Sequence, residues 1–492
     1  MLQELAELRE DARGLARDLA VERWRRAAGL PAETPLRELV KAHRLATSPD
    51  GLAQARETLE RALAEDPRRP ARIARLTALR DLLIRARALA LEPGAAQELW
   101  ELQRRPLVRL AGDAGLHGAL PAVAVERELP LVRAREKRAE LERALAAALQ
   151  PADRERGAAW EAAQAALVEA GVSSDGSAAE LAESVLRETE GTARDLGGWL
   201  LERHTGAKPY PSRAERHDVL HLLHAPRCAG AFPRGEMVRT VRRWAEMLRL
   251  DLSEVKVDDD DRPLKEWGSR AEPIDPPWEV RVSVLPEEGP RALASLLGAV
   301  SVAQLRAGPA SDAPPEDLWL GEHAVVWACR ALLEGLVRER EFVRRCAKAD
   351  LPRDDERAIA IAAVIDARLA AARTLGSLAA HELGLGGRAA QASREAFARA
   401  TGAELPAGLA LAQLDPWLEP AAELRGRALA SRMREFLREL YDEDWWRNPR
   451  SLPSLSGLWA RGGRNTMAEL WTEVGGEPGV QALAAELTEA CR

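Results

Sequence analysis

Hydrophobic residues recur every three or four positions through most of the first hundred residues, and charged residues fill the positions between them. The pattern is clearest at Leu5, Leu8, Ala12, Leu15 and Leu19. Because this spacing puts apolar side chains on one face of a helix, it predicts amphipathic helices from residue 2 to about residue 104. Glycine and proline interrupt the pattern at residues 29–31, 48–51, 66–67 and 92–94. We therefore expect helical hairpins in this part of the chain.

The helical spacing continues at about residues 126–150 and 152–171. A run rich in glycine and serine follows at residues 171–177 and predicts a loop. Serine is a residue type that caps helix N-termini, so we expect a further helix to begin at about residue 178 with Ser177 as its N-cap. A domain boundary in this loop divides the chain into an N-terminal helical domain, residues 1–175, and a second domain, residues 176–492.

Strand signals are short and lie in the second half of the chain. Apolar and polar residues alternate at Val255–Val257 and at Glu279–Leu285, as expected for strands with one buried face. The segment that follows, residues 291–305, is apolar nearly all round, which predicts a buried central helix with Leu296 filling space in the core. The pattern as a whole predicts a mainly α protein with a small β-sheet.

Several short segments of the second half occur in a characteristic order. They are 217–226 with 231–233, Val255–Asp258 with Arg262–Lys265, Pro277–Val284, Asp444–Pro449 and Leu458–Gly462. In order and spacing they resemble segments of zinc metallopeptidases of the thimet-oligopeptidase and oligoendopeptidase type, especially bacterial ones, over about residues 190–492. The resemblance implies a zincin-like oligopeptidase architecture, in which two helical lobes flank a deep groove and a small sheet lies beside the metal-binding helix.

The zinc motif that this resemblance leads us to expect is degenerate. Its working form is His-Glu-x-x-His, in which two histidines one helical turn apart bind zinc and the glutamate activates the metal-bound water. Here Ser295, Leu296 and Ala299 occupy those positions and offer neither an imidazole nor a carboxylate. Glu322 lies about where the resemblance implies the third ligand, but one carboxylate cannot hold catalytic zinc. Glu322 also suits a helix start, where a carboxylate meets the positive end of the helix dipole.

A second departure from the family concerns the oxyanion. The resemblance implies tyrosines after the Asp415–Pro416 step, where a phenol donates to the oxyanion of the tetrahedral intermediate. Glu419 and Glu423 stand at those positions instead. A carboxylate would repel the developing charge, so this difference points in the same direction as the loss of the zinc ligands.

Other polar clusters have metal-like spacing. His217, His221 and His224 recur along nearly one helix face, and two of them could share a metal. Asp218 is shorter than the glutamate of a zinc motif, and the segment lies outside the metal helix in the family order. We expect a surface or half-buried helix with ordinary histidines, and we keep a metal site as a weaker alternative.

Two further segments are expected to be structural. His381-Glu382 begins like the zinc motif, but its fifth residue is Leu385, so we expect helix packing followed by a glycine stop at residues 386–387. The acidic run at residues 258–261 lacks the spacing of a calcium loop and predicts a solvated turn.

Composition limits the location and the partners. The net charge of −7, from 71 basic and 78 acidic residues, disfavours a general nucleic-acid binder. Apolar runs are shorter than the roughly 20 residues needed to cross a bilayer, so we expect no membrane span. The N-terminus has no secretory signal pattern, and four scattered cysteines suit a reducing compartment. We therefore expect a cytoplasmic protein.

Three hypotheses about function follow. The first is an inactive metallopeptidase homologue, or pseudopeptidase. It would bind no cofactor and would serve as a scaffold or as a binding protein for a peptide or protein partner. The second is an active zinc metallopeptidase with a non-standard site such as His217, His221 and Glu322. The third is a structural helical adaptor whose groove is filled by side chains. An open groove of roughly several hundred cubic ångströms would favour the first hypothesis over the third. The sequence does not determine the oligomeric state.

Overall fold

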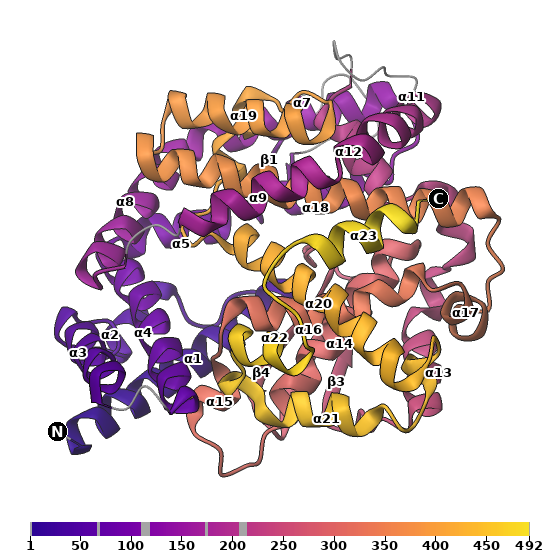
Figure 1. The fold of residues 1–492 in the computed structure, drawn as a ribbon. Helices are drawn as coiled ribbons and strands as arrows, with labels where there is room; N and C mark the ends of the chain where they lie inside the picture. Colours follow the sequence, from indigo (N-terminus) through magenta and orange to yellow (C-terminus); the bar gives the residue numbers. More distant parts are fainter. Residues whose placement is uncertain (1, 66–68, 110–118, 173–175, 206–213, 492) are drawn as a thin grey trace.

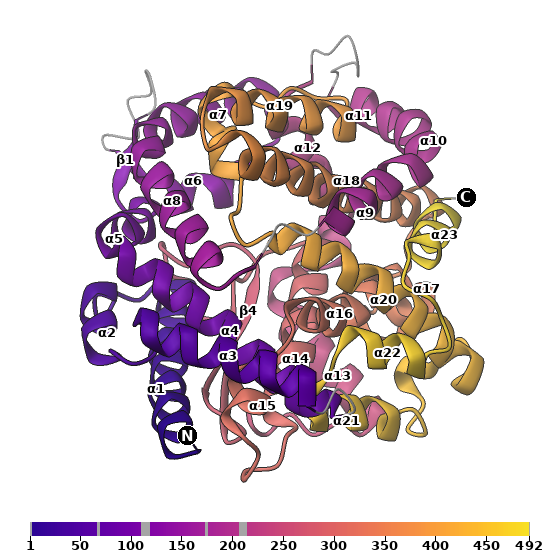
Figure 2. The ribbon, with the colours of Figure 1, turned by 60° about the vertical axis from the view of Figure 1, so that its left-hand side comes forward.

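The computed structural model describes residues 2–65, 69–109, 119–172, 176–205 and 214–491. Helices form most of it, and they are arranged in lobes above and below a central region (Figures 1 and 2). The mainly α fold predicted from the sequence is confirmed. Of the described residues, no helix is both long enough and apolar enough to cross a membrane.

The first part of the chain folds as the predicted helical hairpins. Its helices are α1 (Leu2–Ala27), α2 (Leu36–Ala42), α3 (Pro49–Glu65), α4 (Pro70–Leu91) and α5 (Pro93–Leu102), and a short pair of strands follows, β1 (Pro106–Val108) and β2 (Leu120–Pro121). The breaks near residues 30, 49 and 93 are confirmed. The predicted break at residues 66–67 lies outside the described residues.

The predicted helix at 126–150 is wrong as a single element. The structure has α6 (Ala122–Glu128) and α7 (Arg135–Leu149), followed by α8 (Asp153–Glu169). Pro130 explains the interruption, because the residue before a proline is disfavoured in the helical conformation and proline itself donates no backbone hydrogen bond. The next helix, α9 (Gly176–Glu188), begins before Ser177, so Ser177 lies in its first turn and not at the N-cap.

The second part of the chain contains the remaining helices and the main sheet. The helices are α10 (Glu190–Thr192), α11 (Gly198–Thr205), α12 (Arg216–Leu223), α13 (Met237–Leu248), α14 (Pro290–Ala307), α15 (Pro315–Trp319), α16 (His323–Glu334), α17 (Arg340–Phe342), α18 (Arg353–Leu383), α19 (Gly387–Thr401), α20 (Glu419–Tyr441), α21 (Leu452–Arg461), α22 (Met467–Glu473) and α23 (Gln481–Glu489). Short 3₁₀ and π segments connect several of them.

The sheet has three strands in the order β3-β5-β4, namely β3 (Val255–Asp258), β5 (Glu279–Val284) and β4 (Ser269–Asp275). β5 pairs in parallel with β3 and antiparallel with β4. The strands at residues 255 and 279 were predicted and are confirmed. β4 was not predicted, because its proline and its polar residues hide the alternation of an edge strand.

Helix α14 lies at the centre of this part of the molecule, packed against the sheet and against α16. Leu296 is 1% exposed and Ala299 is fully buried, which confirms the predicted central helix. One large hydrophobic core consists of buried side chains drawn from residues 102 to 491. A second, smaller core consists of buried side chains drawn from residues 8 to 170. The boundary at 175/176 adjoins residues 173–175, which lie outside the described residues, and stays a prediction.

Candidate functional site

The segment where the resemblance implies the zinc motif lies on α14, and there Ser295 Oγ accepts two hydrogen bonds. The backbone N–H of Ser269, at the start of β4, donates to Ser295 Oγ at 2.7 Å, and Arg330 Nη2 donates to the same oxygen at 3.1 Å. Leu296 and Ala299 contribute only apolar surface to the core. The residues at the three motif positions therefore provide one hydroxyl oxygen, and two donors already saturate it.

Arg330 on α16 is the cation that faces this hydroxyl. Its Nη1 donates to Ser269 O at 3.2 Å, and its Nε lies 2.7 Å from Glu334 Oε1. Gly298 makes this approach possible, because a Cβ there would lie 2.7 Å from side-chain carbons of Arg330 and Glu334. A guanidinium with three partners at this face disfavours a divalent cation by charge repulsion.

Glu322, the expected third ligand, lies at the other end of α16. It is the N-cap residue, and the backbone N–H of Met467 donates to its Oε2 at 2.9 Å. The residue of α16 that faces Ser295 is Arg330, about two helical turns farther along. The structure thus places Glu322 at a helix start, as expected, and does not bring it to Ser295. Burial raises its pKa.

A second ion network borders the same side of α14. Asp366 on α18 binds Arg291 at 3.1 Å and also binds Arg427 on α20, and Arg427 binds Glu423 at 2.5 Å. Burial alone would raise the pKa of Asp366, but Arg427 and Arg291 hold it well below its usual range. The cavity between these side chains and Ala294 measures only about 90 Å³, so side chains fill most of this space.

Sequence reasoning missed both networks, although a signal for each was present. Arg330 with Glu334 and Glu423 with Arg427 are pairs of opposite charge four residues apart, the spacing that brings side chains together on a helix. The spacing cannot reveal Asp366, which comes from another helix.

An open pocket of about 540 Å³ lies between the N-terminal helices and α16, α18 and α20. Its polar lining includes Arg85, Glu322, His323, Glu419 and Arg425. We call it the interlobe pocket. In it, Glu419 Oε1 lies 2.6 Å from His323 Nδ1 and accepts a 2.7 Å hydrogen bond from Arg85. Burial raises the pKa of Glu419, but the contacts with His323 and Arg85 outweigh it and lower the pKa to about 2.

His381 and Glu382 also line the interlobe pocket, near the end of α18. His381 Nδ1 lies 2.7 Å from Gln164 Nε2, and its ring packs at 5.1 Å from Trp160. The helix ends at Leu383, and Gly384 follows with a positive φ of 76°. The expectation of helix packing is confirmed, but the stop is Gly384 and not residues 386–387. Asp258 of the acidic run is the last residue of β3, and residues 259–261 follow as an exposed segment without regular structure, so the run is solvated as expected but is not a turn. Lys265 Nζ donates to Asp258 O at 2.8 Å.

His217 and His221 of α12 and His224, which directly follows the helix, are all buried, so the expected surface or half-buried helix is wrong. The reason is that α12 packs between α7, α11 and α18. His221 Nδ1 lies 2.7 Å from Pro130 O, and His224 Nδ1 lies 2.9 Å from Leu220 O. Burial lowers the pKa of His224 to about 3.

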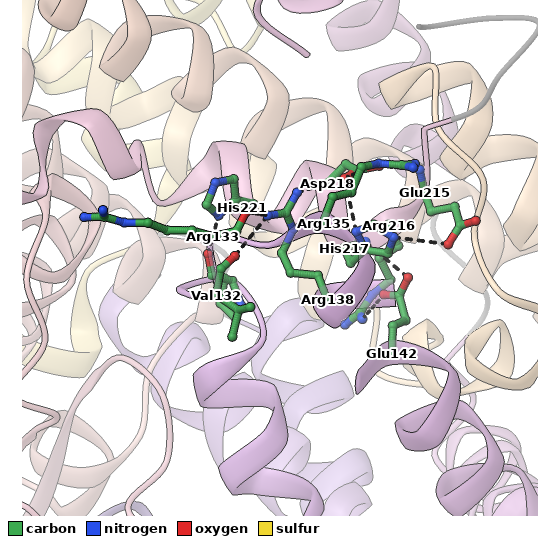
Figure 3. Close-up of polar contacts among 11 residues, drawn as sticks. Val132, Arg133, Arg135, Arg138, Glu142, Glu215, Arg216, His217, Asp218 and His221 are labelled. Carbon is green, nitrogen blue, oxygen red and sulfur yellow. Dashed lines mark hydrogen bonds and ion pairs between the residues drawn. The ribbon is translucent and has the colours of Figure 1, made fainter. Parts of the chain in front are cut away.

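His217 belongs to a different group. Its neighbours are Glu142 of α7 and Glu215, the residue before α12 (Figure 3). The structure therefore gathers His217 with these two carboxylates, and the sequence-based set of His217 with His221 and Glu322 is not assembled.

Comparison with solved structures identifies the fold. A protein from Bacillus anthracis described as an oligoendopeptidase F aligns with a TM-score of 0.61 and 11% identity, over 92% of this chain and 84% of that one. The Pyrococcus furiosus carboxypeptidase aligns with a TM-score of 0.58 and 13% identity, over 99% and 98%. The M32 carboxypeptidase of Deinococcus radiodurans aligns with a TM-score of 0.52 and 15% identity, over 99% of both chains.

These alignments show that the chain has the helical fold of such peptidases along nearly its whole length, which confirms the expected architecture. At these identities they concern the fold alone. No family model matches the sequence. No curated protein matches it either.

Proposed function

We propose that this protein is a pseudopeptidase, a member of the peptidase fold that binds a peptide or a protein segment without hydrolysing it. The α14 face is proposed to bind no zinc. The observation that carries this proposal is the contact between Arg330 and Ser295. The guanidinium places a positive charge beside residue 295 and donates a hydrogen bond to its hydroxyl oxygen.

The chemistry of the surrounding positions supports the same proposal. Leu296 cannot act as a general base, and Ala299 cannot ligate a metal. Glu419, where the resemblance implies a tyrosine, is an anion paired with His323 and Arg85. Zinc-dependent peptide hydrolysis needs a Lewis acid, a general base and a hydrogen-bond donor to the oxyanion together. At the positions where the resemblance implies these groups, the sequence has no zinc-binding pair, no base and no tyrosine.

The interlobe pocket is the proposed binding site. Its volume of about 540 Å³ falls within the range of roughly 300–1,000 Å³ typical of ligand sites. Cations such as Arg425 and anions such as Glu382 both line it, so it suits the mixed polarity of a peptide better than an apolar ligand. This open volume favours a binding protein over a purely structural adaptor. A cytoplasmic location is part of the proposal, and the four buried, unpaired cysteines support it.

The test is to incubate the purified protein with a mixed peptide library and to measure retention and cleavage by mass spectrometry. Ala422 lines the interlobe pocket on α20, so Ala422→Phe should fill the pocket and abolish retention. Ala460 is exposed on α21, away from the pocket, and Ala460→Phe is the matched control that should retain peptides like the wild type.

The two alternative hypotheses predict different results. Cleavage that survives repurification and stops on addition of a chelator would establish an active metallopeptidase. No retention by either protein would favour the structural adaptor. Equal retention by Ala422→Phe and the wild type would show that peptides bind outside the interlobe pocket, and the proposed binding site would be wrong.

A further inference from the structure

A cluster of metal-ligating side chains lies where α7 meets the start of α12 (Figure 3), away from α14 (Figure 1). Glu142, Glu215 and His217 each offer one ligand atom, and these atoms all lie within 4.8 Å of one another. Glu142 and His217 are 1% and 0% exposed. Glu215 is 45% exposed at its side chain, so water can reach one side of the cluster.

His217 is the observation that separates this cluster from an ordinary ion network. Neither of its ring nitrogens has a hydrogen-bond partner with good geometry, although the ring is fully buried. Nε2 lies 3.2 Å from Glu215 Oε2, and Nδ1 lies 3.1 Å from Asp218 Oδ1. A buried polar group without a hydrogen bond costs about 1–3 kcal/mol. A ligand that engages Nε2 would remove this penalty.

The surroundings of His217 match the supporting shell of a metal site. A metal-bound imidazole characteristically donates its other ring N–H to a carboxylate, which fixes the ring. Asp218 lies on that side of the ring, with its Oδ1 3.1 Å from Nδ1, where a small rotation of the ring on metal binding would let it accept this bond. Arg138 Nη2 donates to its Oδ1 at 3.1 Å, and Arg135 Nη2 donates to its Oδ2 at 2.9 Å.

We propose that Glu142, Glu215 and His217 bind a Zn²⁺ ion that ties α7 to the first turn of α12. One imidazole and two carboxylates form a donor set that favours zinc over magnesium, which prefers oxygen ligands alone. Water completes the shell on the side of Glu215. The role is structural, because a polypeptide substrate cannot reach an ion held between buried Glu142 and buried His217.

The cluster must contract slightly to bind the ion. Zinc bonds of about 2.0–2.2 Å place tetrahedral ligand atoms about 3.3–3.6 Å apart, compared with the 4.8 Å limit observed here. The carboxylate of Glu142 can make this movement. Arg216 Nη1 donates to its Oε1 at 2.9 Å, while its Oε2 accepts only a 3.2 Å bond from the backbone N–H of His217. The Arg216 contact can persist while Oε2 turns toward the ion.

The test is a titration of chelator-treated, full-length protein with Zn²⁺, followed by calorimetry and by elemental analysis after gel filtration. We expect one Zn²⁺ per chain, and at least tenfold weaker binding in Glu142→Gln and in His217→Gln. Glu142→Gln keeps an acceptor for Arg216, so the fold should survive, and circular dichroism checks this. Zn²⁺ should raise the melting temperature of the wild type but not that of Glu142→Gln, and Mg²⁺ should raise neither.

His323→Gln and Glu322→Gln, in the interlobe pocket, are the matched controls and should bind Zn²⁺ like the wild type. The proposal is wrong if the wild type binds no Zn²⁺, or if Glu142→Gln and His217→Gln bind it unchanged. Either result leaves the pseudopeptidase proposal standing. Loss of Zn²⁺ binding in the His323 and Glu322 variants alone would overturn this proposal and would also bring a metal into the interlobe pocket.

Discussion

Glu287 illustrates how a single buried carboxyl group can control stability. It lies in the loop between β5 and α14 and is 6% exposed, and its Oε1 has no hydrogen-bond partner. Burial raises its pKa to about 7, since the opposing effect of Arg127 is smaller. The folded protein therefore favours the protonated form, whereas the unfolded chain ionises near its ordinary value of about 4.3.

The sign of the pH dependence follows from this difference. Because the folded pKa is the higher one, stability is full below about pH 4.3 and is lost as the pH rises to about 7. At about 1.4 kcal/mol per pH unit the loss is about 3–4 kcal/mol. Glu287→Gln should therefore be more stable than the wild type at pH 8 by about this amount, relative to their difference at pH 4.5.

Urea unfolding at several pH values measures this effect. The neighbouring Glu288 is exposed, so Glu288→Gln is the control and should show no such trend. A difference between Glu287→Gln and the wild type that stays constant from pH 4.5 to 8 would contradict the raised pKa.

At the scale of elements, the contact between α16 and α20 depends on Gly426. A Cβ at this position would lie 2.5 Å from Trp327 Cβ and 2.6 Å from the backbone nitrogen of Ala328. Contacts this short with backbone atoms require the two helices to separate. Gly426→Ala should therefore destabilise the protein by about 1–3 kcal/mol or more, the usual cost of overpacking.

Gly457 provides the control for Gly426. It lies within helix α21, and a Cβ there would have no neighbour within 4 Å. Gly457→Ala should be neutral or stabilising by roughly 0.5–1 kcal/mol, because alanine loses less entropy in a helix. Equal unfolding midpoints for the two variants in a denaturant titration would show that α16 and α20 are not as closely packed as described.

Helix periodicity predicted most elements of the fold, but it did not predict elements whose stability comes from distant partners. β4 exists because β5 provides its hydrogen-bond partners, and Pro273 within it conceals the strand from local pattern. The split between α6 and α7 was available in the sequence at Pro130 and was overlooked. Ser177 shows the opposite error, since a good capping residue type lies inside the helix that it was expected to begin.

At the scale of the whole molecule, the sequence singled out Ser295, Leu296 and Ala299 but not the residues that surround them. Ser295 stood out because a known motif was expected there. Glu142, the partner of His217, is 75 residues away and on another helix, and a single sequence carries no signal for such a contact. The contact between Arg330 and Ser295 could not be predicted either, because Arg330 lies on a separate helix. Sites built from several elements therefore emerge only from the fold.

Peptide hydrolysis would need groups on α14, α16 and α20 together. We therefore predict that introducing the zinc motif on α14 alone will not create a peptidase. The variant Ser295→His/Leu296→Glu/Ala299→His restores two histidines and a base on α14, but Arg330 remains beside position 295 as a cation that repels Zn²⁺. Glu322 stays at the far end of α16, bonded to Met467.

Catalytic groups that act as a unit have strongly non-additive effects, so a partial set gives little activity. Glu419, at the position where the resemblance implies a tyrosine, would still repel the oxyanion. We therefore expect this triple variant to hydrolyse a mixed peptide library no faster than its chelator-treated control.

Zinc content should be compared in a His217→Gln background, which removes the proposed site at α12. The new base should also destabilise the fold, because Leu296 is 1% exposed and burying an ionised carboxylate is costly unless it is paired. Circular dichroism should confirm folding first. Chelator-sensitive hydrolysis by the folded variant would show that α14 alone determines activity in this chain.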